Sequence, residues 1–442
     1  MELTYHWGEG DILEKELEYT KASIQQAISK NAIMEAVQYL KRALALTKRL
    51  PEGSSRDAVE LGLQVQLGGL LVPTQGFAAQ DVLDTFDRAH RLCDKLGDDG
   101  SLLPVNWGLW SFFTVRAELG RALQLAEAVM RLGDASDRPD VVRLGRHLRA
   151  ATQFWRGELR GLETPIQEFL SGLDRESNQV FPFAPQEDPE VQALSYLAWL
   201  LWLRGCPEEA EEKSQQAIAI AQTLERRDHL AFALGFAAQY SAYRRDFKRA
   251  SLLADASITL AEKHGFPFWL GAARILRGSA MVRSGRGREG IAELEQGLEI
   301  YGLTGARVFK PSFLLLQAQA YFTTGDHQTA RTILENANAQ IDATGERINE
   351  AEILLNLGEI AHRLGETADA EKTLESAIAV AQRQGALAFE LRATTSLAWL
   401  MRAAGRKSEA AARLALACRA FPQNCNWSEL AAARALLEQF SN

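Results

Sequence analysis

Cysteine, proline and clustered basic residues are all scarce in this 442-residue sequence. Its four cysteines include no CxxC pair, so neither a zinc ribbon nor a disulfide framework is predicted, and a reducing cytoplasm is the expected location. Twelve prolines leave few helix breakers. The net charge of -8, without a block of Lys and Arg interleaved with aromatics, argues against nucleic acid as a direct partner.

Long hydrophobic runs and catalytic motifs are also missing. The most apolar stretch, LSYLAWLLWL at 194–203, is about half of the roughly 20 residues that a membrane span needs, so we expect a buried helix and no membrane partner. The first residues, MELTYHWGEGDILEKELEY, are acidic and do not resemble a secretory signal. There is no GxxxxGK[ST] loop, HExxH or GxSxG, so we expect no cofactor, no metal and no catalytic activity.

Small residues recur every forty positions in the second half of the sequence. The composition, 47% hydrophobic and 24% charged, already favours an all-α protein. One row of the repeat is Ala210, Ala250, Gly290, Ala330, Ala370 and Ala410. Seven residues further on stand Ala217, Ser257, Gly297, Ala337, Ala377 and Ala417. Small side chains at this spacing indicate the points where two packed helices approach each other closely.

A third row precedes the first by five residues and marks turns. It contains Gly205, Arg245, Gly285, Gly325, Gly365 and Gly405, and Arg245 is its single departure from glycine. Glycine at this place fits the end of the first helix of a pair. A fixed period of this length predicts a right-handed α-solenoid of about ten tetratricopeptide-like helix pairs, each of about 40 residues.

Three segments are expected along one continuous solenoid. Residues 1–170 carry diverged helical repeats, and residues 191–442 carry the regular repeats. Between them, residues 171–190 hold three prolines and no helical periodicity, which predicts a long loop.

The order of several sequence blocks resembles a known family region. It is the C-terminal helical-repeat region of bacterial multidomain signalling proteins, in which a nucleotide cyclase, kinase or DNA-binding domain precedes a STAND-type predicted ATPase. The blocks that carry the resemblance include AIMEAVQYLKRALALTKRL, NWGLWSFFTVRAELGRALQLAEAVMRL, DPEVQALSYLAWLLWLRGCPEEA and RQGALAFELRATTSLAWLMRAAGRKSEA. The resemblance implies a non-catalytic regulatory scaffold, either free-standing or cut from a longer chain that holds the enzymatic domains.

Candidate binding residues follow from the side of the first helices that faces the concave groove of a solenoid. They mix aromatic, amide and charged groups, which suits recognition of a protein or peptide. The set is Trp199, Trp202, Gln239, Gln319, Glu359, His362, Trp399 and Arg402. Core packing is an equal alternative for the two tryptophans of 194–203, because aromatic side chains dominate core burial.

Other functions stay open at this point. A metabolite pocket near Trp199, Gln239 and Glu359 would make the chain a small-molecule sensor, and an apolar convex face would make it a structural scaffold. Glu359 and His362 lie one helical turn apart, but no second pair faces them, so a metal site is not predicted. Gly285–Gly290 matches GxGxxG without the preceding strand that a dinucleotide site requires.

Overall fold

A computed structural model describes residues 13–30, 32–173, 188–224, 227–422 and 425–441. These residues form 21 helices and no strand, so the predicted all-α fold class is confirmed. The inner helices are α2 (Leu13–Ser29), α4 (Ser54–Gln75), α6 (Asp99–Val115), α8 (Pro139–Trp155), α10 (Pro189–Leu203), α12 (Arg227–Tyr243), α14 (Pro267–Arg283), α16 (Lys310–Thr323), α18 (Glu350–Arg363) and α20 (Leu387–Ala403).

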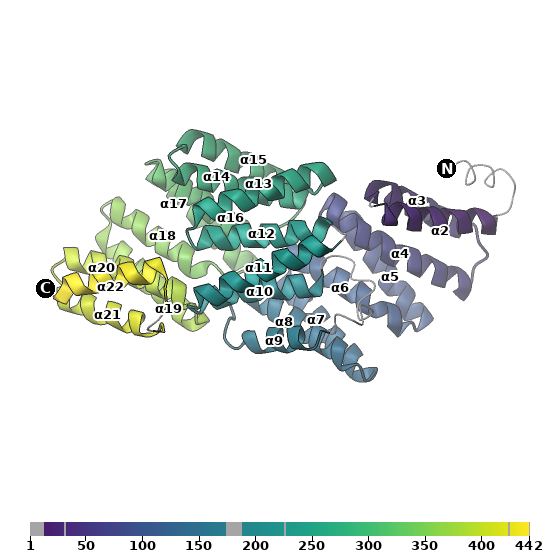
Figure 1. The fold of residues 1–442 in the computed structure, drawn as a ribbon, viewed down its shortest axis with the longest axis horizontal. Coiled ribbons are helices and arrows are strands. Elements are labelled where there is room, and N and C mark those ends of the chain that lie inside the picture. The colour runs from purple at the N-terminus through teal and green to yellow at the C-terminus, as the bar shows by residue number, and fades with distance from the viewer. Residues whose placement is uncertain (1–12, 31, 174–187, 225–226, 423–424, 442) are drawn as a thin grey trace.

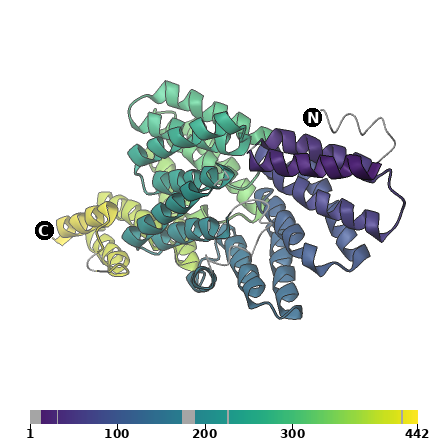
Figure 2. The same cartoon turned by 45° about the vertical axis from the view of Figure 1, so that its right-hand side comes forward.

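Each inner helix is followed by an outer helix, which completes ten tetratricopeptide-like pairs. The outer helices are α3 (Ile33–Thr47), α5 (Gln80–Leu96), α7 (Leu119–Ala135), α9 (Glu163–Ser171), α11 (Pro207–Thr223), α13 (Phe247–His264), α15 (Gly287–Leu303), α17 (His327–Thr344), α19 (Thr367–Gln384) and α21 (Lys407–Arg419). A last helix, α22 (Ser428–Ser441), covers the final pair. The N-terminal helices (purple) and C-terminal helices (yellow) lie at opposite ends of the molecule in Figures 1 and 2.

The small residues of the forty-residue pattern lie where inner and outer helices touch. Ala370 and Ala377 on α19 are completely buried. A Cβ atom added to Gly358 on α18 would lie only 2.8 Å from the Leu374 Cγ atom. The two helices therefore approach closely because these positions carry little or no side chain.

The turn glycines adopt the left-handed backbone conformation that is typical of glycine at the end of a helix. Gly205, Gly365 and Gly405 all have positive φ angles, between +78° and +84°. Arg245 occupies the same position in its repeat and has φ of +62°, which is uncommon for a residue with a side chain. The expected loop at 171–190 falls largely outside the described residues, which omit 174–187. On either side, α9 ends at Ser171 and α10 begins at Pro189.

The solenoid turns back so that later repeats cover the inner face of earlier ones. The backbone carbonyl of Val115, the last residue of α6, accepts hydrogen bonds from the N–H groups of Arg307 and Val308 at 2.8 and 2.9 Å. The carbonyl of Trp155, the last residue of α8, accepts bonds from Arg347 and Ile348 in the same register. Carbonyl groups at a helix end have no partner within the helix, so the next turn of the solenoid supplies one.

Aromatic side chains fill the space between the two turns. Phe309, in the loop before α16, has its ring centre 4.6 Å from that of Trp155 and 5.6 Å from that of Phe236. Its φ angle of +64° is strained for a phenylalanine. The N–H group of Phe309 donates a hydrogen bond of 3.0 Å to a side-chain oxygen of the buried Glu346, which helps to hold this conformation.

We predict that Ala370→Leu destabilises the fold by about 1 to 3 kcal/mol, because the extra side chain has no space between α18 and α19. The free energy of unfolding is measured by urea titration followed by circular dichroism. Ala368→Leu is the matched control, since Ala368 lies exposed on the same helix. Equal stabilities of the two variants would contradict the packing role of Ala370.

Candidate functional site

A polar cavity of about 140 Å³ opens among five inner helices, α12, α14, α16, α18 and α20, and we call it the inner cleft. It lies where the end of α12 meets α16, α18 and α20. Two of the predicted binding residues, Gln319 and Glu359, line it. The other polar and charged residues that line it are Tyr243, Arg245, Arg283, Thr323, Glu352, Asn356 and Arg392.

Arg392 is the centre of the ion network at the base of the inner cleft. Its buried guanidinium donates to Glu352 at 3.1 Å and to Glu429 at 2.8 Å, and lies over the ring of Trp202. It also donates a 2.7 Å hydrogen bond to the carbonyl of Tyr243, the last residue of α12. Burial works against the charge of Arg392, but the two carboxylates raise its pKa above the ordinary value. The network therefore joins helices that are far apart in the sequence.

Arg245 brings a second cation to the same network. Its side chain is half exposed and pairs with Glu429 at 3.2 Å and with Glu352 at 3.8 Å. These ion pairs give a reason for an arginine at a turn position that is glycine in five other repeats. The departure from the glycine row thus marks a residue of the cleft.

Inner helices exchange side-chain hydrogen bonds between residues that are 37 positions apart. Gln319 donates to Asn356 at 3.2 Å, and the Ser396 hydroxyl donates to Glu359 at 2.7 Å. Burial raises the pKa of the Glu359 carboxyl above its ordinary value, and the bond from Ser396 partly offsets this shift. Gln319 and Glu359 are both half-buried, so each combines an inter-repeat bond with access to the cleft.

The last three predicted residues lie exposed further along the same helices. Trp399 on α20 is 51% exposed, and the guanidinium of Arg402 lies 5.1 Å from its ring centre. Arg402 also approaches Phe440 of α22, and His362 is exposed on α18. An open tryptophan with a stacked arginine is the combination of side chains that commonly anchors protein partners.

Trp199, Trp202 and Gln239 are buried and are not part of this open surface. Their side chains are at most 2% exposed, and the second turn of the solenoid covers Trp199 and Trp202. The Trp199 ring stacks on Phe309 at 6.3 Å between ring centres. For the two tryptophans, the structure thus agrees with the core-packing alternative. The amide nitrogen of Gln239 has no hydrogen-bond partner among the described residues.

A second cavity, which the sequence pattern did not indicate, lies between the two turns. This aromatic chamber has a volume of about 40 Å³ and is enclosed by buried residues. The hydroxyl groups of Ser111 and Thr114 border it, and neither has a hydrogen-bond partner among the described residues. Its aromatic walls are Phe77, Trp110, Trp155, Tyr196, Phe232, Phe236, Phe268, Trp269 and Phe309.

The described part of the chain offers neither a membrane-spanning helix nor a metal-binding cluster. No helix there is long and apolar enough to cross a membrane. No group of three or more His, Cys, Asp and Glu side chains is arranged there to hold a metal ion.

The tetratricopeptide repeat pattern matches parts of this chain. The matched residues are 309–383, 349–423 and 191–212, which lie in the regular repeats. The tetratricopeptide part of the family resemblance is therefore confirmed. Repeats of this kind are generally non-catalytic scaffolds that bind protein partners.

Proteins similar to this chain include a bacterial relative and several solved structures. An uncharacterized protein of Rhizobium meliloti (strain 1021) is 24% identical over 89% of the chain, which spans only 38% of that protein's length. A Rap protein complexed with competence and sporulation factor is 12% identical, with a TM-score of 0.50 over 77% of this chain and 97% of that chain. This likeness concerns the fold alone.

The second structure is a STAND protein with a tetratricopeptide repeat sensor from Pyrococcus horikoshii. It is 15% identical to this chain, with a TM-score of 0.44, and the match covers 86% of this chain and 55% of that chain.

We predict that Arg392→Met destabilises the fold by about 3 to 5 kcal/mol, because it leaves the buried Glu352 without its main cation. Urea titration of the wild type and the variant measures the difference in their free energies of unfolding. Arg413→Met is the control, since Arg413 forms partly exposed ion pairs on α21. A loss for Arg392→Met no larger than that for Arg413→Met would show that the network contributes little.

We also predict that the wild-type fold loses stability as the pH rises, because the buried Glu346 must give up its proton, and that Glu346→Gln abolishes this loss. Burial raises the pKa of Glu346 well above its ordinary value of 4.5, so the unfolded chain loses this proton at lower pH than the folded chain. The wild type therefore loses stability as pH rises above about 4.5 through the folded pKa. The free energy of unfolding of the variant and the wild type is measured at about pH 5 and about pH 8. Relative to the wild type, the variant should be more stable at the higher pH than at the lower one. A difference independent of pH would contradict the shift.

Proposed function

We propose that this chain is a regulatory scaffold that binds a peptide segment of a partner protein along the inner cleft and the adjoining surface of α18 and α20. The cleft holds the polar groups that a peptide backbone needs, because Gln319 and Asn356 carry amides that both donate and accept hydrogen bonds. The exposed Trp399–Arg402 pair would supply the apolar anchor beside it.

The observation that carries this proposal is the change of exposure along one row of inner-helix positions. Trp199 and Gln239 are buried, Gln319 and Glu359 are half-buried, and Trp399 is open. The repeats from α16 onward therefore keep their inner face available, whereas the earlier repeats use theirs for packing.

We further propose that peptide binding controls a switch domain, such as a STAND-type ATPase or a nucleotide cyclase, in the cytoplasm. The long Rhizobium meliloti relative supports this, since this chain matches only 38% of it and leaves room for other domains. The coupling would act through curvature, because repeats contact mainly their neighbours and a ligand that prefers one curvature shifts the population toward it.

A small-molecule sensor is the second candidate. The specific observation in its favour is the aromatic chamber, where the hydroxyls of Ser111 and Thr114 have no hydrogen-bond partner among the described residues and would orient an uncharged molecule small enough for about 40 Å³. Mass spectrometry of molecules released from the purified chain separates this candidate from the peptide binder.

The proposal is tested with a random peptide library displayed on phage and selected on the wild-type chain. We expect a selected peptide to bind at least about tenfold more weakly to the double variant Trp399→Ala, Arg402→Ala, because the anchor is lost. Fluorescence anisotropy with the labelled peptide measures both dissociation constants.

The matched control is Leu416→Ala, Arg419→Ala, which removes one large apolar and one basic side chain from the exposed face of α21. This control should bind the peptide as the wild type does. Failure to select any peptide, or equal binding by the anchor variant, would reject the inner cleft as a peptide site.

A further inference from the structure

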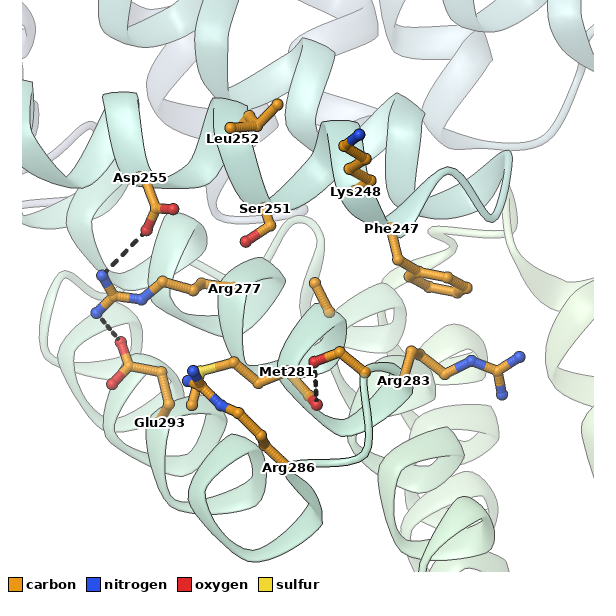
Figure 3. Close-up of a pocket in the computed structure, with 12 residues that line it drawn as sticks. Phe247, Lys248, Ser251, Leu252, Asp255, Arg277, Met281, Arg283, Arg286 and Glu293 are labelled. Atoms are coloured by element: carbon orange, nitrogen blue, oxygen red, sulfur yellow. Dashed lines mark hydrogen bonds and ion pairs between the residues drawn. The ribbon is translucent and has the colours of Figure 1, made fainter.

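A larger open groove lies on the other side of α14, and we call it the α13–α15 groove (Figure 3). Its volume is about 820 Å³. One end carries the chain of ion pairs from Asp255 through Arg277 to Glu293, and Phe247 and Arg283 lie at the other end. The remaining lining residues are Lys248, Ser251, Leu252, Ala280, Met281, Ser284 and Arg286.

Glycines account for the shape of this groove. A Cβ atom on Gly278 of α14 would lie 2.5 Å from the carbonyl oxygen of Gly290 on α15, and one on Gly297 would lie 2.8 Å from that of Gly271. The backbones of α14 and α15 are thus in direct contact, closer than any side chain at these positions would allow. Helix α15 lies deep against α14, and the groove is the space that remains between α15 and α13.

The groove carries more positive than negative charge, although the whole chain has a net charge of -8. Arg277, at a position where other repeats have mainly Leu, is balanced by Asp255 and Glu293. Lys248 and Arg283 form no ion pair among the described residues, and the pair of Arg286 with Glu289 is exposed and therefore weak. The cations of the groove are thus available to a partner's carboxylates.

Apolar groups lie between these cations. Leu252 on α13 is 63% exposed and lines the groove. Met281 is half-buried in the wall on α14, and its flexible side chain can adapt to different partners. An apolar floor, together with the carboxylates of Asp255 and Glu293, fits a nucleic-acid backbone poorly, because phosphates would meet like charge.

We propose that the α13–α15 groove binds an acidic amphipathic helix of a partner protein. Its apolar side chains would contact Leu252 and Met281, while its carboxylates would pair with Lys248, Arg283 and Arg286. This is a second interaction surface, separate from the inner cleft. The two sites share only the wall formed by Phe247 and Arg283, whose guanidinium lies 5.0 Å from the ring centre of Phe247.

The probe for the experiment is a fluorescein-labelled synthetic helix with glutamates on one face and leucines on the other. We expect the wild-type chain to bind it in an anisotropy titration, with weaker binding as salt is raised. Lys248→Glu with Arg286→Glu should weaken binding at least about tenfold, because attraction becomes repulsion. Lys407→Glu with Arg419→Glu makes the same change of net charge on α21 and should leave binding unchanged.

The apolar contact is tested by Leu252→Asp, with the similarly exposed Leu416→Asp as its control. Only Leu252→Asp should weaken binding, and a probe with serines in place of leucines should bind poorly to every variant. The proposal is overturned if the wild type does not bind the probe, or if groove and control variants bind it equally. It is also overturned if Trp399→Ala with Arg402→Ala abolishes binding, since the probe would then occupy the inner cleft.

Discussion

Hydrogen bonds to the last carbonyl groups of inner helices determine the shape of this solenoid. Val115, Trp155 and Tyr243 end α6, α8 and α12, and in each case the carbonyl oxygen accepts bonds from a segment far along the chain. A free helix end would leave these groups to water, whereas here they fasten one turn to the next. Neighbour contacts alone would allow a range of curvatures, so these distant bonds select one.

Closure of the turns also decides where a ligand has access. The aromatic side chains of α8, α10 and α12 become core, because they pack against Phe309 in the loop before α16, and Trp202 of α10 also packs against Phe389 of α20. The C-terminal halves of α16, α18 and α20 are less covered, since Gln319 and Glu359 are half-buried and Trp399 is exposed, and the inner cleft lies there. A solenoid of one repeated unit therefore has two different inner surfaces.

The forty-residue pattern was sufficient to predict the helix pairs. Ala370 and Ala377 lie where adjacent helices pack, and the turn glycines lie between the two helices of a pair. It could not distinguish Trp199 from Trp399, because both occupy the same repeat position and differ only in what the distant turn covers. Arg245 did carry a signal, as an arginine where the pattern has glycine, and the structure explains it by ion pairs to Glu352 and Glu429. Phe309 and the aromatic chamber left no signal in the sequence, because the chamber is lined by residues of repeats that are distant along the chain.

The Phe247–Arg283 pair has a thermodynamic consequence, because it is a common wall of the inner cleft and the α13–α15 groove. A ligand that shifts this pair from one side changes the shape of the other cavity. Linkage makes such an effect equal in both directions, so each occupant would alter the affinity of the other by the same factor. If both proposed sites bind their partners, this wall would couple the two binding events.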